Sequence, residues 1–97
     1  MGVYYHHTTQ INWDNIQKSG ELRPQWDLQR GCSTIHIARD PHVAADYAGD
    51  IMLEIDFNGK TFETNPGDDN RLYVVDIIPI RDVKKIEKDD WREVWVI

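Results

Sequence analysis

The dipeptide Asn58-Gly59 lies between two stretches in which apolar and polar residues alternate, IMLEIDF (residues 51–57) and KTFET (residues 60–64). Alternation with a period of two is typical of a β-strand that has one buried face. Asn-Gly favours the two-residue turn of a β-hairpin, because that turn needs positive φ angles. The pattern therefore predicts an antiparallel pair of strands joined at residues 58–59.

Other stretches rich in β-branched and aromatic residues predict more strands. These are residues 3–7, 33–40, 71–80 and the C-terminal run WREVWVI, 91–97. Residues 21–33 and 65–70 carry Gly, Pro and mixed polarity, so both are interpreted as loops, and the first is long enough to cover a cleft. The run DVKKIEKDD, residues 82–90, is interpreted as a solvated charged segment.

Two short helices are predicted from their end signals. Thr9 is a candidate N-cap for a helix of two to three turns that Gly20 ends. Asp40 is a second N-cap, with Pro41 at the first helical position and Gly49 after the end. The expected fold is a single small α+β domain over residues 1–97, with a twisted, mostly antiparallel sheet and two short helices.

Composition excludes several classes of function. The 97 residues are 40% hydrophobic and 29% charged, and no apolar run approaches a membrane span of about 20 residues. No signal-peptide pattern is visible, and the single Cys32 fits a reducing cytoplasm better than a disulfide framework. A net charge of −6 argues against a general nucleic-acid binder and suits docking on a basic protein surface. Oligomeric state is left open.

Adjacent histidines occupy the first predicted strand. Neighbouring strand residues point to opposite faces, so His6 and His7 cannot both enter the same core. One packed and one solvated side chain is the simpler alternative to a ligand site. A metal site is not expected, because these two histidines with His36 and His42 lack a known ligand spacing.

Three blocks in order carry a family resemblance: YHHTT, then INWDNIQKSGELRP, then STIHIARDPHVAADYAGD. Together they resemble the ADP-ribosyltransferase family, in which a Tyr-His-Gly-Thr-type strand precedes a short helix and a G-x-L-R/K-P-like turn. The resemblance implies an ADP-ribosyltransferase-like fold and an enzyme that cleaves NAD and transfers ADP-ribose to a macromolecular target such as a protein. A chain this short is similar to the small phage-borne members that disarm bacterial defence proteins in the host cytoplasm.

The resemblance also implies roles for individual residues. His6 matches the histidine that hydrogen-bonds a ribose hydroxyl of NAD. His7 stands where many members have Gly, next to the backbone that docks the nicotinamide amide, so nicotinamide docking is in doubt. Tyr47 matches an aromatic residue near the nicotinamide ring, whereas Thr8 and Arg23 are pocket or phosphate neighbours.

A late glutamate is the candidate catalytic residue. Alternation in WREVWVI places Trp91, Glu93 and Trp95 on one strand face, and a carboxylate between two indoles needs water or a partner. Cleavage of the nicotinamide–ribose bond builds positive charge on the sugar, which a fixed carboxylate stabilises. We expect His6 and Glu93 on opposite walls of one cleft. A solvated Glu93 on a strand whose other face is buried is the alternative.

Two function classes remain. Tyr47 shares a helix face with Val43, so it could pack in the core without touching a ligand. The first class is the NAD-cleaving ADP-ribosyltransferase, which depends on His6, Tyr47 and Glu93 converging. The second is a small acidic, non-enzymatic protein that inhibits a partner by occupying its basic surface.

Overall fold

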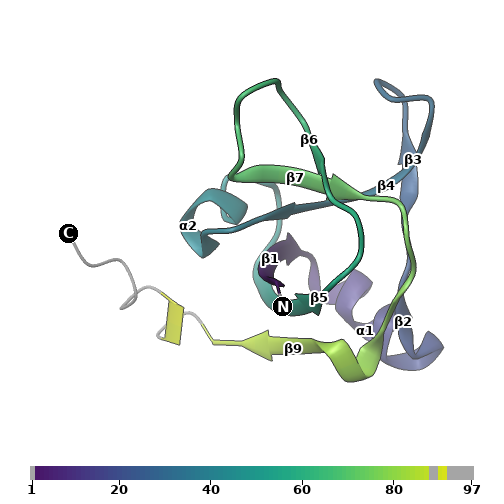
Figure 1. Cartoon of the computed structure of the whole chain (residues 1–97). Helices are drawn as coiled ribbons and strands as arrows, with labels where there is room; N and C mark the ends of the chain where they lie inside the picture. The colour runs from purple at the N-terminus through teal and green to yellow at the C-terminus, as the bar shows by residue number, and fades with distance from the viewer. Residues whose placement is uncertain (1, 88–89, 92–97) are drawn as a thin grey trace.

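A computed structural model describes residues 2–87, 90 and 91 of the chain (Figure 1). Its helices are α1 (Gln10–Ser19), α2 (Pro41–Ala44) and a single 3-10 turn, η1 (Ile80–Asp82). Its strands are β1 (Gly2–Thr8), β2 (Glu21–Leu22), β3 (Gln25–Asp27), β4 (Cys32–Ala38), β5 (Ile51–Phe57), β6 (Phe62–Glu63), β7 (Arg71–Val74), β8 (Ile78–Pro79) and β9 (Val83–Ile86).

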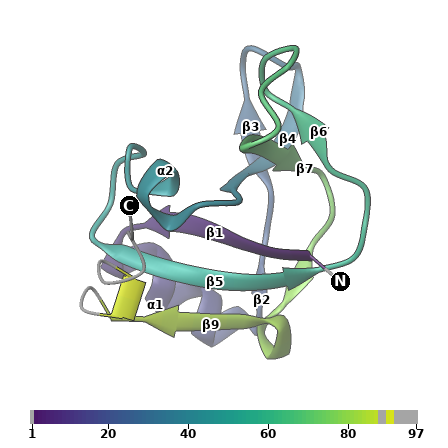
Figure 2. The ribbon, with the colours of Figure 1, turned by 60° about the vertical axis from the view of Figure 1, so that its left-hand side comes forward.

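The main sheet has the order β6-β7-β4-β1-β5-β9, with β3 paired to β4, and β2 pairs separately with β8. Every strand pair in the described part of the chain is antiparallel. In Figure 2, β1, β5 and β9 lie side by side, while β4 runs away from them toward β3, β6 and β7. The fold is therefore the small α+β domain with a mostly antiparallel sheet and two helices that the sequence predicts.

Local capping signals set both helix starts. The Thr9 side chain accepts a hydrogen bond from the Asn12 N–H at 3.2 Å, and Gly20 ends α1 with a left-handed φ of 79°. The Asp40 carboxylate accepts from the His42 N–H at 2.8 Å, so the second cap prediction is confirmed too, although α2 is only four residues long. Among the described residues, no helix is long and apolar enough to cross a membrane.

The hairpin predicted at Asn58-Gly59 is wrong. β5 pairs with β1 along its whole length on one edge and with β9 on the other. Both edges of β5 are therefore occupied, and the segment after the turn has no edge on which to fold back. The chain instead crosses to the far side of the sheet, where β6 pairs with β7.

Three other predictions need correction. Residues 21–33 are not mostly loop, because they contain β2, β3 and the start of β4. Residues 71–80 form two strands, because the chain leaves β4 after β7 and then pairs with β2 as β8. Residues 82–90 are not simply a solvated run, since β9 lies within them and buries Val83.

The predicted C-terminal strand, residues 91–97, falls largely outside the described residues. Trp91 is described and is buried, in a helical turn. Glu93 and Trp95 lie outside the described part of the chain.

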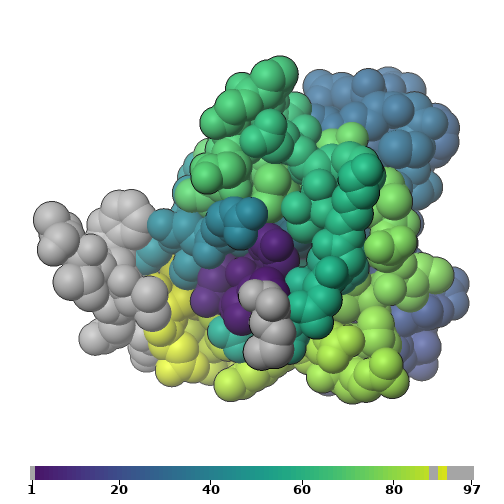
Figure 3. Space-filling view, viewed as in Figure 1, coloured from purple at the N-terminus to yellow at the C-terminus, as the bar shows by residue number. Residues whose placement is uncertain are grey.

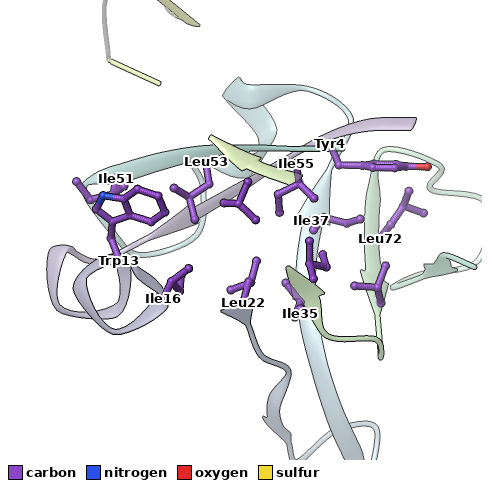
Figure 4. Close-up of a cluster of buried hydrophobic side chains, with 13 residues drawn as sticks. Tyr4, Trp13, Ile16, Leu22, Ile35, Ile37, Ile51, Leu53, Ile55 and Leu72 are labelled. Atoms are coloured by element: carbon purple, nitrogen blue, oxygen red, sulfur yellow. The ribbon is translucent and has the colours of Figure 1, made fainter. Parts of the chain in front are cut away.

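The core lies on both faces of the sheet. The larger cluster is shown in Figure 4 and includes Trp13 and Ile16 from α1, Leu22 from β2, and alternate residues of the long strands. Its buried members are Tyr4, Trp13, Ile16, Leu22, Ile35, Ile37, Ile51, Leu53, Ile55, Leu72, Val74, Ile78 and Val83. A smaller cluster of Ala38, Ala44, Met52 and Trp91 packs α2 on the opposite face. Alternate residues of β4 and β5 thus face different clusters, as the strand period requires.

Gly49 yields the first prediction, because it lies against the end of β1. Its φ is 151°, and a Cβ at this position would collide with the backbone of Thr8. We expect Gly49→Ala to lower the free energy of unfolding by about 3 kcal/mol, from backbone strain and displacement of the Thr8 segment. Chemical denaturation checks this value.

Gly67→Ala is the matched control. Gly67 also has a positive φ, 86°, but no heavy atom lies within 4 Å of the position its Cβ would take. Gly67→Ala places a Cβ on a residue with positive φ but causes no collision, so we expect it to lower the free energy of unfolding by about 1 kcal/mol. Equal losses in the two variants would show that the contact with Thr8 has no energetic weight.

Candidate functional site

One pocket of about 440 Å³ opens at the C-terminal end of β1. Its wall is made by the end of β1, one side of α1, the β2–β3 segment, the middle of β4 and the loop that follows α2. The lining residues are His6, His7, Thr8, Asn12, Asn15, Ile16, Ser19, Glu21, Leu22, Arg23, Gln25, Thr34, Ile35, His36, Tyr47 and Ala48. This volume is within the range of small-molecule sites.

The pocket exists because β1 and β4 separate. β1 pairs with β4 where Tyr5 faces Ala38, whereas the ladder with β5 continues as far as Thr8. Beyond Tyr5, the edge of β1 that faces β4 is open. An open strand edge exposes residues of both faces, so adjacent His6 and His7 line one pocket although they lie on opposite faces of the sheet.

His6 bridges the gap between these strands. Its Nδ1 lies 2.6 Å from the carbonyl oxygen of His36, and because a carbonyl only accepts, Nδ1 carries the proton. Burial lowers the pKa of His6 below 6.5; the His36 carbonyl opposes that shift, and the His36 and His7 imidazoles reinforce it. His6 is therefore neutral at pH 7 and its Nε2 is a hydrogen-bond acceptor.

His7 fastens the loop after α2. Its Nδ1 donates to the carbonyl of Tyr47 at 2.7 Å, and the N–H of Asp50 donates to the carbonyl of Thr8 at 2.9 Å. No described residue other than glycine has a positive φ, so a side chain at His7 causes no backbone strain. The imidazole instead holds Tyr47 in the pocket wall.

Tyr47 lies beyond the C-terminal end of α2, so the helix face that the sequence predicted it to share with Val43 does not reach it. Val43 packs against the smaller core cluster, whereas Tyr47 is half-buried in the pocket wall. Because α2 ends before Tyr47, this residue lines the pocket and does not pack in the core beside Val43.

Thr8 and Arg23 have different environments. Thr8 is buried, and its hydroxyl accepts a hydrogen bond from the Asn12 side-chain amide at 3.2 Å. The Arg23 side chain is 65% exposed and pairs with Glu21, its Nη2 lying 2.6 Å from Oε1. Thr8 is therefore part of the wall, and Arg23 is a cation at the rim.

Carboxylates near the pocket differ from the expected one. Glu93 lies outside the described residues, so its distance from His6 is not described. Of the described residues that line the pocket, the acidic one is Glu21, which sequence reasoning placed in a loop and did not consider. Its position directly after the Gly20 cap is the signal that could have pointed to it.

A second group that sequence reasoning missed lies behind the pocket wall. The Asp27 side chain, 10% exposed, accepts hydrogen bonds from Thr34 at 3.1 Å, His36 at 3.0 Å and Arg30 at 3.2 Å. Burial alone would raise the pKa of Asp27, but the bonds from Thr34 and His36 and the Arg30 charge lower it overall. Asp27 is therefore ionised at neutral pH.

No group of three or more metal-binding side chains forms a metal site in the part of the chain that is described. Comparison with family models, curated proteins and solved structures finds no match to this chain.

The neutral state of His6 predicts a pH dependence of stability. The unfolded chain binds a proton at His6 more readily than the folded one, so the free energy of unfolding falls as pH drops below about 6.5. His6→Gln keeps an N–H donor for the His36 carbonyl but does not titrate. Between roughly pH 7 and pH 5, we expect the variant's melting temperature to fall less steeply than that of wild type. An equal decrease in melting temperature from pH 7 to pH 5 in wild type and variant would contradict a buried, neutral His6.

Proposed function

We propose that the pocket binds NAD and that the protein is an ADP-ribosyltransferase acting on a protein target. The observation that carries the proposal is that all five residues assigned to NAD from the sequence, on three separate segments, line one pocket. These residues are His6, His7, Thr8, Arg23 and Tyr47. Three of these residues are consecutive in β1, and Arg23 and Tyr47 reach the same concavity from two other segments.

The polar groups of the pocket suit the nicotinamide riboside half of NAD. The neutral His6 leaves Nε2 to accept a hydrogen bond from a ribose hydroxyl. Asn12 and Asn15, on the pocket side of α1, supply amide groups for the nicotinamide carboxamide. The Tyr47 ring, on a residue whose backbone carbonyl accepts a hydrogen bond from His7, supplies a flat apolar surface for the nicotinamide ring.

The rim suits the pyrophosphate of the same ligand. Arg23 is exposed there and forms a close ion pair with Glu21. A guanidinium binds phosphate oxygens as well as a carboxylate, so the pyrophosphate can replace or share the Glu21 partner. The adenosine half would then extend outside the pocket.

The reaction requires stabilisation of positive charge on the ribose. As the bond to nicotinamide breaks, its electron pair leaves with the ring nitrogen and C1′ becomes cationic. Glu93 remains our candidate carboxylate for this charge, on the strength of the family resemblance. Glu21 lies in the pocket wall, but Arg23 already compensates its charge.

A second function is favoured by a different observation. The β3–β4 hairpin stands out from the body of the molecule, at the upper right of Figure 3, and exposes Trp26 and Leu28, which are 66% and 86% exposed. Exposed aromatic residues often anchor protein–protein interfaces. Together with the net charge of −6, this surface favours a second function, in which the acidic protein inhibits a basic partner by binding it and catalyses no reaction.

NAD binding is tested by thermal stability. At about 100 times its dissociation constant, NAD would stabilise the native state by roughly 2.7 kcal/mol, or about 10–20 °C for a domain of this size. We expect His6→Ala to lose most of this shift. Ile11→Ala, an exposed residue of α1 outside the pocket, is the control and should keep it. Absence of any shift at millimolar NAD would favour the acidic binding protein.

Transferase chemistry is tested at the candidate carboxylate. We expect Glu93→Gln to lower nicotinamide release on the order of 100-fold or more, with little change in NAD affinity, because it removes charge stabilisation in the transition state. Glu21→Gln should change mainly NAD affinity, through Arg23. Released nicotinamide and the intact mass of a modified partner are the measurements. A large rate loss only in Glu21→Gln would move the catalytic role to Glu21.

A further inference from the structure

His36 is a pocket residue to which the proposed function gives no role. It lies in the middle of β4 and lines the pocket, and His6 bonds to its backbone carbonyl. The His36 side chain is 32% exposed. Its imidazole lies near the rings of Tyr47 and Tyr73, with centroid distances of 5.5 Å and 6.4 Å. The His36 backbone thus contacts His6, which we assign to the NAD ribose, and the His36 ring lies beside Tyr47, which we assign to the nicotinamide ring.

Asp27 determines which nitrogen of His36 carries the proton. The ionised carboxylate only accepts, so the His36 nitrogen 3.0 Å from it, Nε2, must be the donor. Thr34 and Arg30 hold the same carboxylate oxygen, and Arg30 is itself held by the carbonyl of Thr64 at 3.0 Å. Several hydrogen bonds therefore fix the orientation of the imidazole and keep a proton on its Nε2.

The other ring nitrogen is left without a partner. Nδ1 of His36 is buried and forms no hydrogen bond with any described residue. A buried polar atom without a partner costs about 1–3 kcal/mol, and such atoms are uncommon in folded proteins. A basic nitrogen on a pocket-lining residue whose ring lies beside Tyr47 is suited to receive a proton from a ligand.

We propose that His36, oriented by Asp27, is the general base that takes the proton from the acceptor that attacks NAD. The inference rests on the proposed function and adds to it the class of acceptor, a hydroxyl group or water. The acceptor oxygen forms a bond to C1′ of the ribose while the bond from C1′ to nicotinamide breaks. The electron pair of that bond leaves with nicotinamide, which becomes neutral, and the acceptor proton passes to Nδ1.

The step requires a movement of the pocket wall, because Nδ1 of His36 is buried. Tyr47, whose ring centroid lies 5.5 Å from that of His36, is the half-buried wall residue that would turn. The turn would break the contact between the guanidinium of Arg71 and the Tyr47 ring, whose centroid lies 5.8 Å from the guanidinium carbon.

A purely structural role for the pair is the competing explanation. Asp27 pairs with Cys32 across the hairpin, and its bonds to Thr34 and His36 fasten β3 to β4. Such a role predicts that replacing His36 affects every reaction at the site equally. A base role predicts a loss only where the acceptor has a proton to give up.

Azide separates these explanations, because it is an anionic nucleophile that forms a bond to C1′ without losing a proton. We would measure nicotinamide release from NAD with water and with azide as the acceptor, in wild type, His36→Gln and Asp27→Asn. With water we expect His36→Gln to lose on the order of 100-fold or more, and Asp27→Asn a smaller but clear loss. With azide both variants should approach the wild-type rate. His42→Gln, which changes a histidine outside the pocket lining, should match wild type with both acceptors.

Each result is decisive. An equal loss with both acceptors, or no loss in His36→Gln, would overturn the base assignment while wild-type nicotinamide release upholds NAD cleavage in the pocket. Absence of nicotinamide release by wild type with either acceptor would overturn this inference, and the transferase is overturned with it if the intact mass of a partner is also unchanged. Nitrogen-15 NMR of labelled histidine tests the tautomer without activity: we expect the His36 proton on Nε2, and a proton on Nδ1 would refute the proposal.

Discussion

The hydrogen bond from His6 to the carbonyl of His36 is the interaction on which the site depends. It spans the place where β1 and β4 cease to pair, so the part-buried carbonyl of His36 is satisfied by a side chain. Because of this bond, the His36 carbonyl has a partner although β1 and β4 do not pair at this point. It also fixes His6 as a neutral acceptor and ties the β4 backbone at His36 to the pocket. A substitution at His6 therefore affects the fold and the site together.

The separation of these strands follows from how the two halves of the sheet are held. β5 is locked between β1 and β9, and β4 is held by β3 and β7, so each half has its own set of ladder bonds. Hydrophobic side chains from both halves and from α1 fill the larger core between them (Figure 4). The sheet can therefore diverge at one end of β1 while the core remains continuous, and the pocket occupies that divergence.

Several features could be predicted from the sequence because their causes are local. The caps at Thr9 and Asp40 and the Gly20 stop each depend on residues a few positions away, and the long strands show their own alternation. The strands β2 and β9 were missed because they are short and pair with strands far along the chain, β8 and β5. The hairpin prediction failed for the same reason, since a turn signal does not reveal that both edges of β5 are already occupied.

The sequence by itself determined the chemical groups available to the site and the ends of the helices that carry some of them. Motif order was enough to select His6, His7, Thr8, Arg23 and Tyr47, all of which line the pocket. Tertiary structure alone decided that Asp27 orients His36 and which ring nitrogen of His6 and of His36 carries a proton. The physical reason is that these properties depend on distances of about 3 Å between atoms of different strands, and sequence spacing does not specify such distances.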